Sequence, residues 1–123
     1  MWVEPDGDGM NIWQESVTDK IRLVGVNGRL DQNLTPTLEA ELLSLLDEGI
    51  YYLIVDLDKV NYINSGGLRC LVTAWRQAHQ HGGDLVLCGL NDRVTKVFSM
   101  VGFDKVFQIF IDRAAAQEAI QSS

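Results

Sequence analysis

One serine in this sequence stands where a side-chain hydroxyl could take part in chemistry. Ser65 follows Asn64 and precedes Gly66 and Gly67, between an apolar run and a helical apolar pattern. Asn and Ser oxygens accept hydrogen bonds from the first free N–H groups of a helix, so Asn64 and Ser65 both occupy positions typical of an N-cap. The two glycines remove side-chain bulk and leave the hydroxyl accessible. A phosphate at such a position is favoured, because a helix N-terminus stabilises negative charge.

The same turn has other interpretations. The simplest is a plain helix cap, with glycine for a tight turn. A serine hydrolase needs a base, but His79 and His81 stand near the far end of the following helix, roughly 20 Å away at 1.5 Å per residue. The Gly-x-Ser-x-Gly motif of hydrolases is also absent. A nucleotide-binding module would use the Gly66-Gly67 turn to hold a phosphate, but no Walker lysine follows it.

Composition excludes several classes of protein. The chain has 123 residues and a formal net charge of −7, whereas binding to nucleic-acid backbones requires clustered Lys and Arg. No apolar run reaches the roughly 18 residues that span a membrane, and the N-terminus shows no signal-peptide pattern. We therefore expect a soluble, cytoplasmic protein that contacts neither nucleic acid nor membrane.

The thiols and imidazoles show no metal-binding pattern. Cys70 and Cys88 are far apart in sequence and each stands inside an apolar element, which is typical of free buried thiols. His79 and His81 are spaced i, i+2, so they face different directions on a helix and form a poor metal pair. We expect no metal and no cofactor.

Apolar periodicity predicts the element order β-β-α-β-α-β-α-β-α. Strands are expected over residues 11–15, 20–26, 50–57, 84–88 and 106–111. Helices are expected from an N-cap at Thr35 to a stop at Gly49, over 68–81, over 92–101 and from a cap at Asp112 to Ile120. Trp75 lies on the apolar stripe of the second helix and is expected in the core. Residues 1–9 are polar and glycine-rich and are expected to form a flexible lead before a single domain over 10–121.

Strands that alternate with helices predict an α/β fold with a mostly parallel central sheet of about five strands, an antiparallel edge strand and four helices. Functional loops of such sheets gather at the carboxyl ends of the strands. Three loops meet this description, 28–31, 63–67 and 89–92, and we expect them to share one end of the molecule. Among the carboxylates near that end, Asp31 is the best candidate for a partner contact. Asp56 is expected to turn toward backbone donors, and Asp58 lies near it.

Several stretches resemble one family in register. Residues 56–68, DLDKVNYINSGGL, resemble the signature of the STAS domain in its anti-sigma factor antagonist branch. Residues 28–31 resemble the loop after the second strand of that family, 82–87 its strand after the long helix, and 94–107 the tail of its third helix. The similarity covers roughly residues 10–121. Several spaced pieces in one order are far more specific than the Ser65 turn alone.

The resemblance implies a regulatory role rather than an enzyme. Such antagonists bind an anti-sigma factor that is also a serine kinase, which frees a sigma factor and so regulates transcription indirectly. In this partner switching, phosphorylation of the antagonist releases the kinase, and a cognate phosphatase restores the unphosphorylated form. A sensory STAS module that binds a nucleotide or small ligand is the alternative.

The family's phosphorylated serine maps onto Ser65. The family usually has Asp before this serine and Ser or Thr after it, where this chain has Asn64 and Gly66. Asn keeps the shape and capping ability of Asp without its charge. The residues expected to bind the partner are Asp31, Asn64, Ser65, Gly66, Gly67, Asn91 and Asp92.

Overall fold

The computed structural model describes residues 11–122, so the lead predicted over residues 1–9 lies outside the described part of the chain. The strands are β1 (Ile12–Ser16), β2 (Ile21–Leu30), β3 (Tyr52–Ile63), β4 (Asp84–Cys88) and β5 (Ile109–Phe110). The helices are α1 (Thr35–Asp47), α2 (Ser65–Gln80), α3 (Asp92–Met100) and α4 (Arg113–Gln121), with a 3-10 turn, η1 (Phe103–Lys105). No helix within residues 11–122 is long and apolar enough to cross a bilayer.

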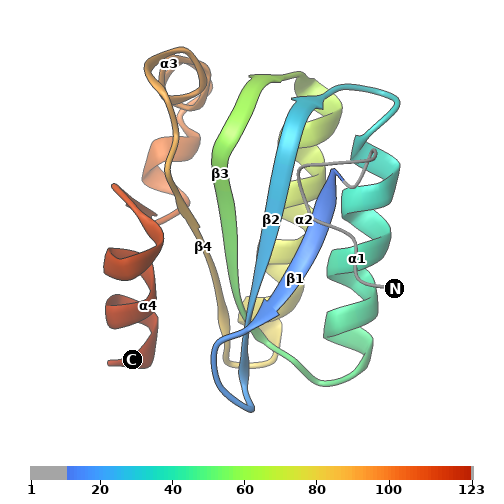
Figure 1. Cartoon of the computed structure of the whole chain (residues 1–123), viewed down its shortest axis with the longest axis vertical. Helices are drawn as coiled ribbons and strands as arrows, with labels where there is room; N and C mark the ends of the chain where they lie inside the picture. The colour runs from blue at the N-terminus through green and yellow to red at the C-terminus, as the bar shows by residue number, and fades with distance from the viewer. Residues whose placement is uncertain (1–10, 123) are drawn as a thin grey trace, which may run out of the picture.

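The five strands form one sheet in the order β1-β2-β3-β4-β5 (Figure 1). β1 pairs antiparallel with β2, and the other neighbouring strands are parallel. The sheet confirms the predicted fold class, a mostly parallel sheet with an antiparallel edge strand and four helices. Parallel strands need crossover connections, and α1, α2 and α3 supply them.

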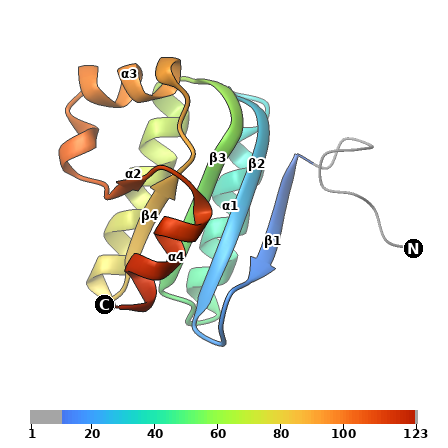
Figure 2. The same cartoon turned by 60° about the vertical axis from the view of Figure 1, so that its left-hand side comes forward.

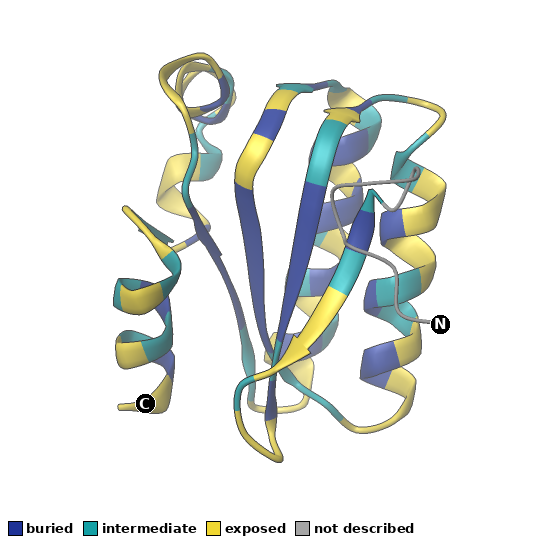
Figure 3. Cartoon of the chain, viewed as in Figure 1, coloured by how far each residue is buried: buried dark blue, intermediate teal, exposed yellow. Residues whose placement is uncertain are grey.

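Helices cover the sheet on two sides. Figure 2 shows α1 and α2 behind the sheet and α4 in front of it. Successive side chains of a strand point to opposite faces, so Leu53 and Val55 of β3 join the core shared with α1 and α2, while Ile54 joins the smaller core under α4. The central parts of β2, β3 and β4 are therefore buried on both faces (Figure 3).

β2 and β3 extend further than the sequence pattern predicts. Their pairing continues from Gly28 opposite Val60 to Leu30 opposite Ile63, past register shifts near Gly25 and Gly28. The predicted loop over 28–31 is therefore mostly strand, and β3 runs to the residue before the Asn64 turn. The sequence pattern did not predict this extension, because Asp58 and Lys59 are polar and exposed and interrupt the apolar run where the pairing is irregular.

The start of α1 also differs from the prediction. Leu34, not Thr35, is the N-cap residue, and it makes no side-chain capping bond. The Asp31 carboxylate stabilises the preceding turn by accepting from the backbone N–H groups of Asn33 at 2.9 Å and Leu34 at 3.2 Å. Pro36 is the second residue of the helix, where its fixed φ suits the first turn.

The strand predicted over 106–111 is almost absent. Only Ile109 and Phe110 pair with β4, and Phe107 is buried against other rings instead. Phe107 makes edge contacts with Phe98 at 6.0 Å and with Trp75 at 6.2 Å between ring centroids. Trp75 is only half-buried at the edge of this cluster, which corrects its expected place inside the core.

Both cysteines are buried and unpaired, as the apolar pattern predicts. Burial raises the pKa of the Cys70 thiol to about 12, with a smaller contribution from the Glu39 carboxylate. Burial likewise raises the pKa of the Cys88 thiol to about 12, with Asp56 adding to the effect. The thiols are therefore protonated and unreactive at neutral pH.

Candidate functional site

The structure brings the three predicted segments together at one end of the sheet. In Figure 1 the ends of β2 and β3, the start of α2 and the whole of α3 lie at the top of the molecule. The Asn64 N–H donates to the Leu30 carbonyl at 3.1 Å, which joins the Ser65 turn to the end of β2. The Asn91 side chain donates to the Val60 carbonyl at 3.1 Å, which joins the start of α3 to β3. The prediction of a shared end is consistent with these bonds.

Asn64 alone is the N-cap of α2. Its backbone is extended, with φ −105° and ψ −177°, and its Oδ1 accepts from the Gly67 N–H at 3.0 Å. Ser65 is the first helical residue rather than a cap, which corrects the shared assignment made from sequence. The Ser65 side chain is exposed, and its hydroxyl makes no hydrogen bond within residues 11–122. The hydroxyl is thus available for modification without loss of a structural contact.

The two glycines after Ser65 have different roles. A Cβ at Gly67 would lie 2.8 Å from Ile63 Cγ1 and 3.3 Å from Leu30 Cβ, so the bare backbone lets α2 begin against the strand ends. A Cβ at Gly66 would meet only Asn64 Oδ1, at an ordinary 3.4 Å. Gly67 is therefore required by packing, whereas Gly66 leaves the surface beside Ser65 open.

Asp31 and Asn91 support the loops of this end. Besides the turn that Asp31 stabilises before α1, its carboxylate lies 4.0 Å from the Arg29 Nε. Asn91 caps α3 by accepting from the Val94 N–H at 2.8 Å. Asp92, in the first turn of α3, is exposed. Their structural roles place these residues around the end of the sheet, and their binding role stays a prediction.

A groove of about 280 Å³ runs beside Ser65 between α2 and the segment that follows α3. Its walls are mostly apolar, and one charged side chain lines it. The lining residues are Ser65, Leu68, Arg69, Val72, Val101 and Phe103. Val101, one of these lining residues, is 50% exposed, and its chain neighbour Met100 is 80% exposed. Sequence reasoning missed Arg69, although its position four residues after Ser65 on a helix was a usable signal.

Asp56 belongs to a different site. Its carboxylate accepts from the Asp58 N–H at 3.0 Å and pairs with Arg113 of α4 at 2.9 Å. The predicted turn of Asp56 toward a backbone donor is confirmed, but the ion pair with α4 was missed. Arg113 also pairs with Glu15 of β1 at 3.0 Å. These contacts fasten α4 to the sheet rather than face Ser65.

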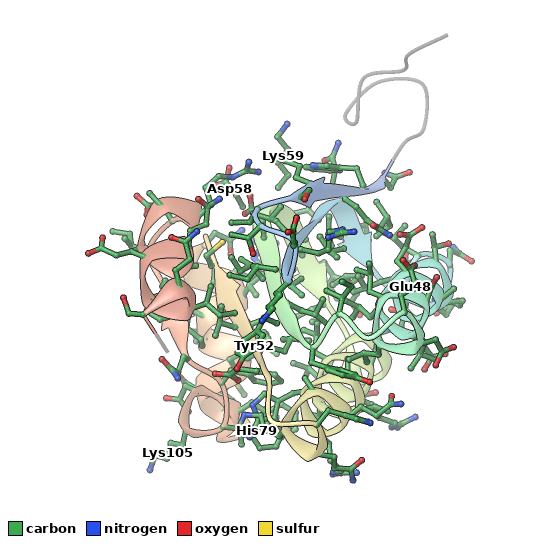
Figure 4. All side chains as sticks on the ribbon, turned by 90° about the horizontal axis from the view of Figure 1, so that it is seen from below. Glu48, Tyr52, Asp58, Lys59, His79 and Lys105 are labelled. Carbon is green, nitrogen blue, oxygen red and sulfur yellow. The ribbon has the colours of Figure 1, made fainter. Side chains whose placement is uncertain are left out.

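The polar residues Asp58, Lys59 and His79 lie in two separate places on the molecule. Seen from below, Figure 4 shows Asp58 and Lys59 on the side of β1, away from His79 near α2. His79 Nε2 lies 3.0 Å from the Asp84 carboxylate, which starts β4 at the other end of the sheet. Within residues 11–122, no three His, Cys, Asp or Glu side chains gather as a metal site requires.

The fold and the turn define a known class of protein. Residues 13–116 match the STAS domain family. The chain therefore belongs to the STAS domain family.

Relatives narrow the class further. The chain is 33% identical over 105 residues to BtrV of Bordetella bronchiseptica, a proposed anti-sigma factor antagonist, covering 85% of this chain and 90% of BtrV. It is 31% identical over 101 residues to the anti-sigma-B factor antagonist of Staphylococcus aureus, covering 81% of this chain and 94% of that protein. Within the STAS family, the chain thus belongs with the anti-sigma factor antagonists, as the sequence motifs predict.

Solved structures share the fold at low identity. The unphosphorylated anti-sigma factor antagonist SpoIIAA matches with a TM-score of 0.81 at 17% identity, over 91% of this chain and 97% of SpoIIAA. The phosphorylated form of Bacillus SpoIIAA matches with a TM-score of 0.73 at 17% identity, over 89% of this chain and 98% of that chain. At this identity the likeness concerns the fold alone.

Proposed function

We propose that this chain binds an anti-sigma factor that is also a serine kinase, and that phosphorylation of Ser65 releases it. The unphosphorylated chain holds the anti-sigma factor and so frees its sigma factor, which regulates transcription indirectly. A phosphatase restores the binding form. The chain acts by binding and not as an enzyme, in the cytoplasm, where sigma factors work. The homologous anti-sigma factor antagonists support this proposal.

One observation in the structure carries the proposal. The Ser65 hydroxyl is exposed at the end of the sheet where β2, β3 and the start of α3 meet, and Asn64 performs the capping that a serine there could otherwise provide. The Ser65 hydroxyl is therefore not needed to cap α2. We assign to the partner interface the residues that the sequence predicts at this end of the sheet, which besides Ser65 are Asp31, Asn64, Gly66, Gly67, Asn91 and Asp92.

The covalent step is a phosphoryl transfer from ATP. The Ser65 oxygen attacks the γ-phosphorus, the bond from that phosphorus to the bridging oxygen of ADP breaks, and the hydroxyl proton passes to a base of the kinase. Hydrolysis by the phosphatase adds water to the phosphorus and returns serine and inorganic phosphate. The antagonist itself supplies only an accessible hydroxyl.

The new charge opposes binding through the interface rather than through the fold. A phosphate adds a charge of about −1.5 to −2 at pH 7. The N-terminus of α2 tolerates this charge, with a stabilisation of roughly 0.3–1 kcal/mol. A partner docked on the same turn must desolvate the phosphate, and an unfavourable buried charge at an interface costs several kcal/mol. Release therefore follows without unfolding.

The structure offers no geometry for a serine hydrolase at this turn. The two histidines of the chain lie near the far end of α2, about 20 Å from Ser65 at 1.5 Å per residue. His79 pairs with Asp84, and the His81 Nδ1 lies 2.9 Å from the Gln77 carbonyl. Neither imidazole reaches the Ser65 hydroxyl to act as its base.

Phosphorylation mapping tests the proposal. The chain is incubated with its cognate anti-sigma kinase and ATP, and the phosphate is located by mass spectrometry, with Ser65→Ala as the matched control. We expect stoichiometric phosphate on Ser65 and none on the control. Exposed Ser44 and Thr73 lie inside α1 and α2 and serve as internal comparisons. Phosphate on either of them with Ser65 unmodified would overturn the proposal.

A further inference from the structure

We propose that Arg69 is the intramolecular partner of a phosphate on Ser65, pairing with it at the edge of the apolar groove beside α2. This inference rests on the proposed function, because it assigns how the modified serine is held. Arg69 was not among the site residues inferred from the sequence motifs.

The spacing brings the two side chains together. Ser65 and Arg69 are i and i+4 on α2, and such residues are neighbours on one helix face. Both line the same groove, and Arg69 is the one charged residue among the lining residues. A guanidinium can bind two oxygens of a phosphate at once, which a single backbone donor cannot.

Arg69 is available for this role. Its side chain is exposed, and it makes no ion pair with any residue of the described range 11–122. The first turn of α2 contains no acidic residue that would compete for it. Among residues 11–122, Arg69 therefore has no fixed acidic partner before a phosphate arrives at Ser65.

Part of the backbone of the first turn is already used by the helix cap. The Gly67 N–H already donates to the Asn64 side chain, and the Leu68 N–H donates to the Asn64 carbonyl at 3.0 Å. Two donors of the helix start are thus occupied by the cap. Arg69 supplies strong donors from the neighbouring turn, which directs the phosphate toward the groove side of α2.

The pairing has a consequence for the groove. A phosphate held by Arg69 fixes a large polar pair next to Leu68 and Val72, at the edge of an otherwise apolar wall. The anti-sigma factor then meets both a charge at Ser65 and an altered groove. A carboxylate at position 65 is shorter and carries one charge, so Ser65→Asp reproduces this pairing only in part.

The test measures the phosphate directly. Phosphoserine is installed at position 65 by genetic encoding, so neither a kinase nor a partner is needed. Phosphorus NMR then follows the second ionisation of the phosphate, whose ordinary pKa is about 6. A nearby guanidinium favours the dianion and lowers this pKa. We expect Arg69→Gln to raise it by about 0.3 or more, in line with an exposed helical ion pair.

Matched variants make the result specific. Arg76→Gln removes another exposed arginine of α2, seven residues further along, and should leave the phosphate pKa unchanged. Arg69→Lys keeps the charge without the planar fork and should give an intermediate pKa. Methyl NMR signals of Val72 and Val101 should shift on phosphorylation in the parent and shift less in Arg69→Gln.

An unchanged phosphate pKa in Arg69→Gln, or an equal change in Arg76→Gln, would overturn the inference. The proposed function fails differently, through absence of phosphate on Ser65 after kinase treatment or through undiminished binding of the phosphorylated chain. Because the encoded phosphoserine needs no kinase, each idea can fail while the other stands.

Discussion

The Asn64 side-chain oxygen accepts a hydrogen bond from the Gly67 backbone N–H at 3.0 Å, and this bond spans Ser65 without using it. Asn64 therefore caps the helix, while the neighbouring Ser65 is exposed and its hydroxyl makes no hydrogen bond to the described part of the chain. The cap thus lies on Asn64, and the adjacent Ser65 is the residue proposed to be phosphorylated. Substitutions at the two positions should consequently affect different properties.

Asn64→Ala should lower the free energy of unfolding by about 1 kcal/mol, the usual cost of losing a helix cap. Ser65→Ala should change it by less than about 0.5 kcal/mol, because the exposed hydroxyl that it removes makes no hydrogen bond within residues 11–122. Asn64→Asp keeps the capping oxygen and should restore stability. Urea denaturation of the three variants measures these differences. Equal losses at both positions would mean that Ser65 shares the cap.

Gly67→Ala should destabilise the protein by about 1–3 kcal/mol, because the new Cβ would lie 2.8 Å from Ile63 Cγ1. Gly66→Ala is the matched control one residue away. Its Cβ fits at 3.4 Å from Asn64 Oδ1, and replacing a helical glycine by alanine favours the helix by up to about 1 kcal/mol. In denaturant unfolding we expect Gly67→Ala to lower the free energy of unfolding and Gly66→Ala to raise it. A stable Gly67→Ala variant would contradict the close approach of α2 to the strand ends.

Arg113→Gln should lower stability by about 1–3 kcal/mol, because the Asp56 carboxylate, whose side chain is only 11% exposed, loses its charged partner. Glu15→Gln is the control, since it removes the exposed partner of the same arginine and should cost less than about 1 kcal/mol. Thermal unfolding of both variants compares them. If the Glu15 variant proves the less stable, the Asp56–Arg113 pair is not the main contact that holds α4 to the sheet.

The thiols should resist alkylation in the folded protein. Burial raises the pKa of Cys70 and Cys88 to about 12, so at pH 8 little thiolate forms, and iodoacetamide should modify both only in denaturant. The folded-state pKa lies above the unfolded value, so the stability gained is complete below about pH 9 and is lost as pH rises toward 12. Rapid labelling of the native chain would show that the thiols are accessible.

The mostly parallel sheet was predictable because strands alternate with helices along the chain and the central strands are apolar on both faces. The residues at which the strands end could not be predicted in the same way. The extension of β3 through Asp58 and Lys59 depends on pairing with β2 rather than on apolar periodicity. Of the strand predicted over 106–111, Ile109 and Phe110 pair with β4, while Phe107 packs against Phe98. Trp75 was predicted in the core from its place on the apolar stripe of α2, but it is half-buried at the edge of the aromatic cluster around Phe107.

The Ser65 turn was visible in the sequence because Asn, Ser and Gly each have a local conformational reason to be there. The groove was not visible, since Val101 and Phe103 reach it from a segment far along the chain. Arg113 and Asp56 are 57 residues apart, and only the crossover topology brings them together. Local chemistry could thus be inferred from residue types, while contacts between distant segments required the fold.

The most direct measurement of the central claim compares partner binding before and after modification of Ser65. The purified anti-sigma factor is titrated by calorimetry with the unmodified chain, the phosphoserine-65 chain and Ser65→Ala. We predict that phosphoserine weakens binding at least about tenfold, which is about 1.4 kcal/mol, while Ser65→Ala binds like the parent. The melting temperature of the phosphorylated chain should move by only a few degrees. If the phosphoserine-65 chain binds the anti-sigma factor as tightly as the unmodified chain, Ser65 is not the switch.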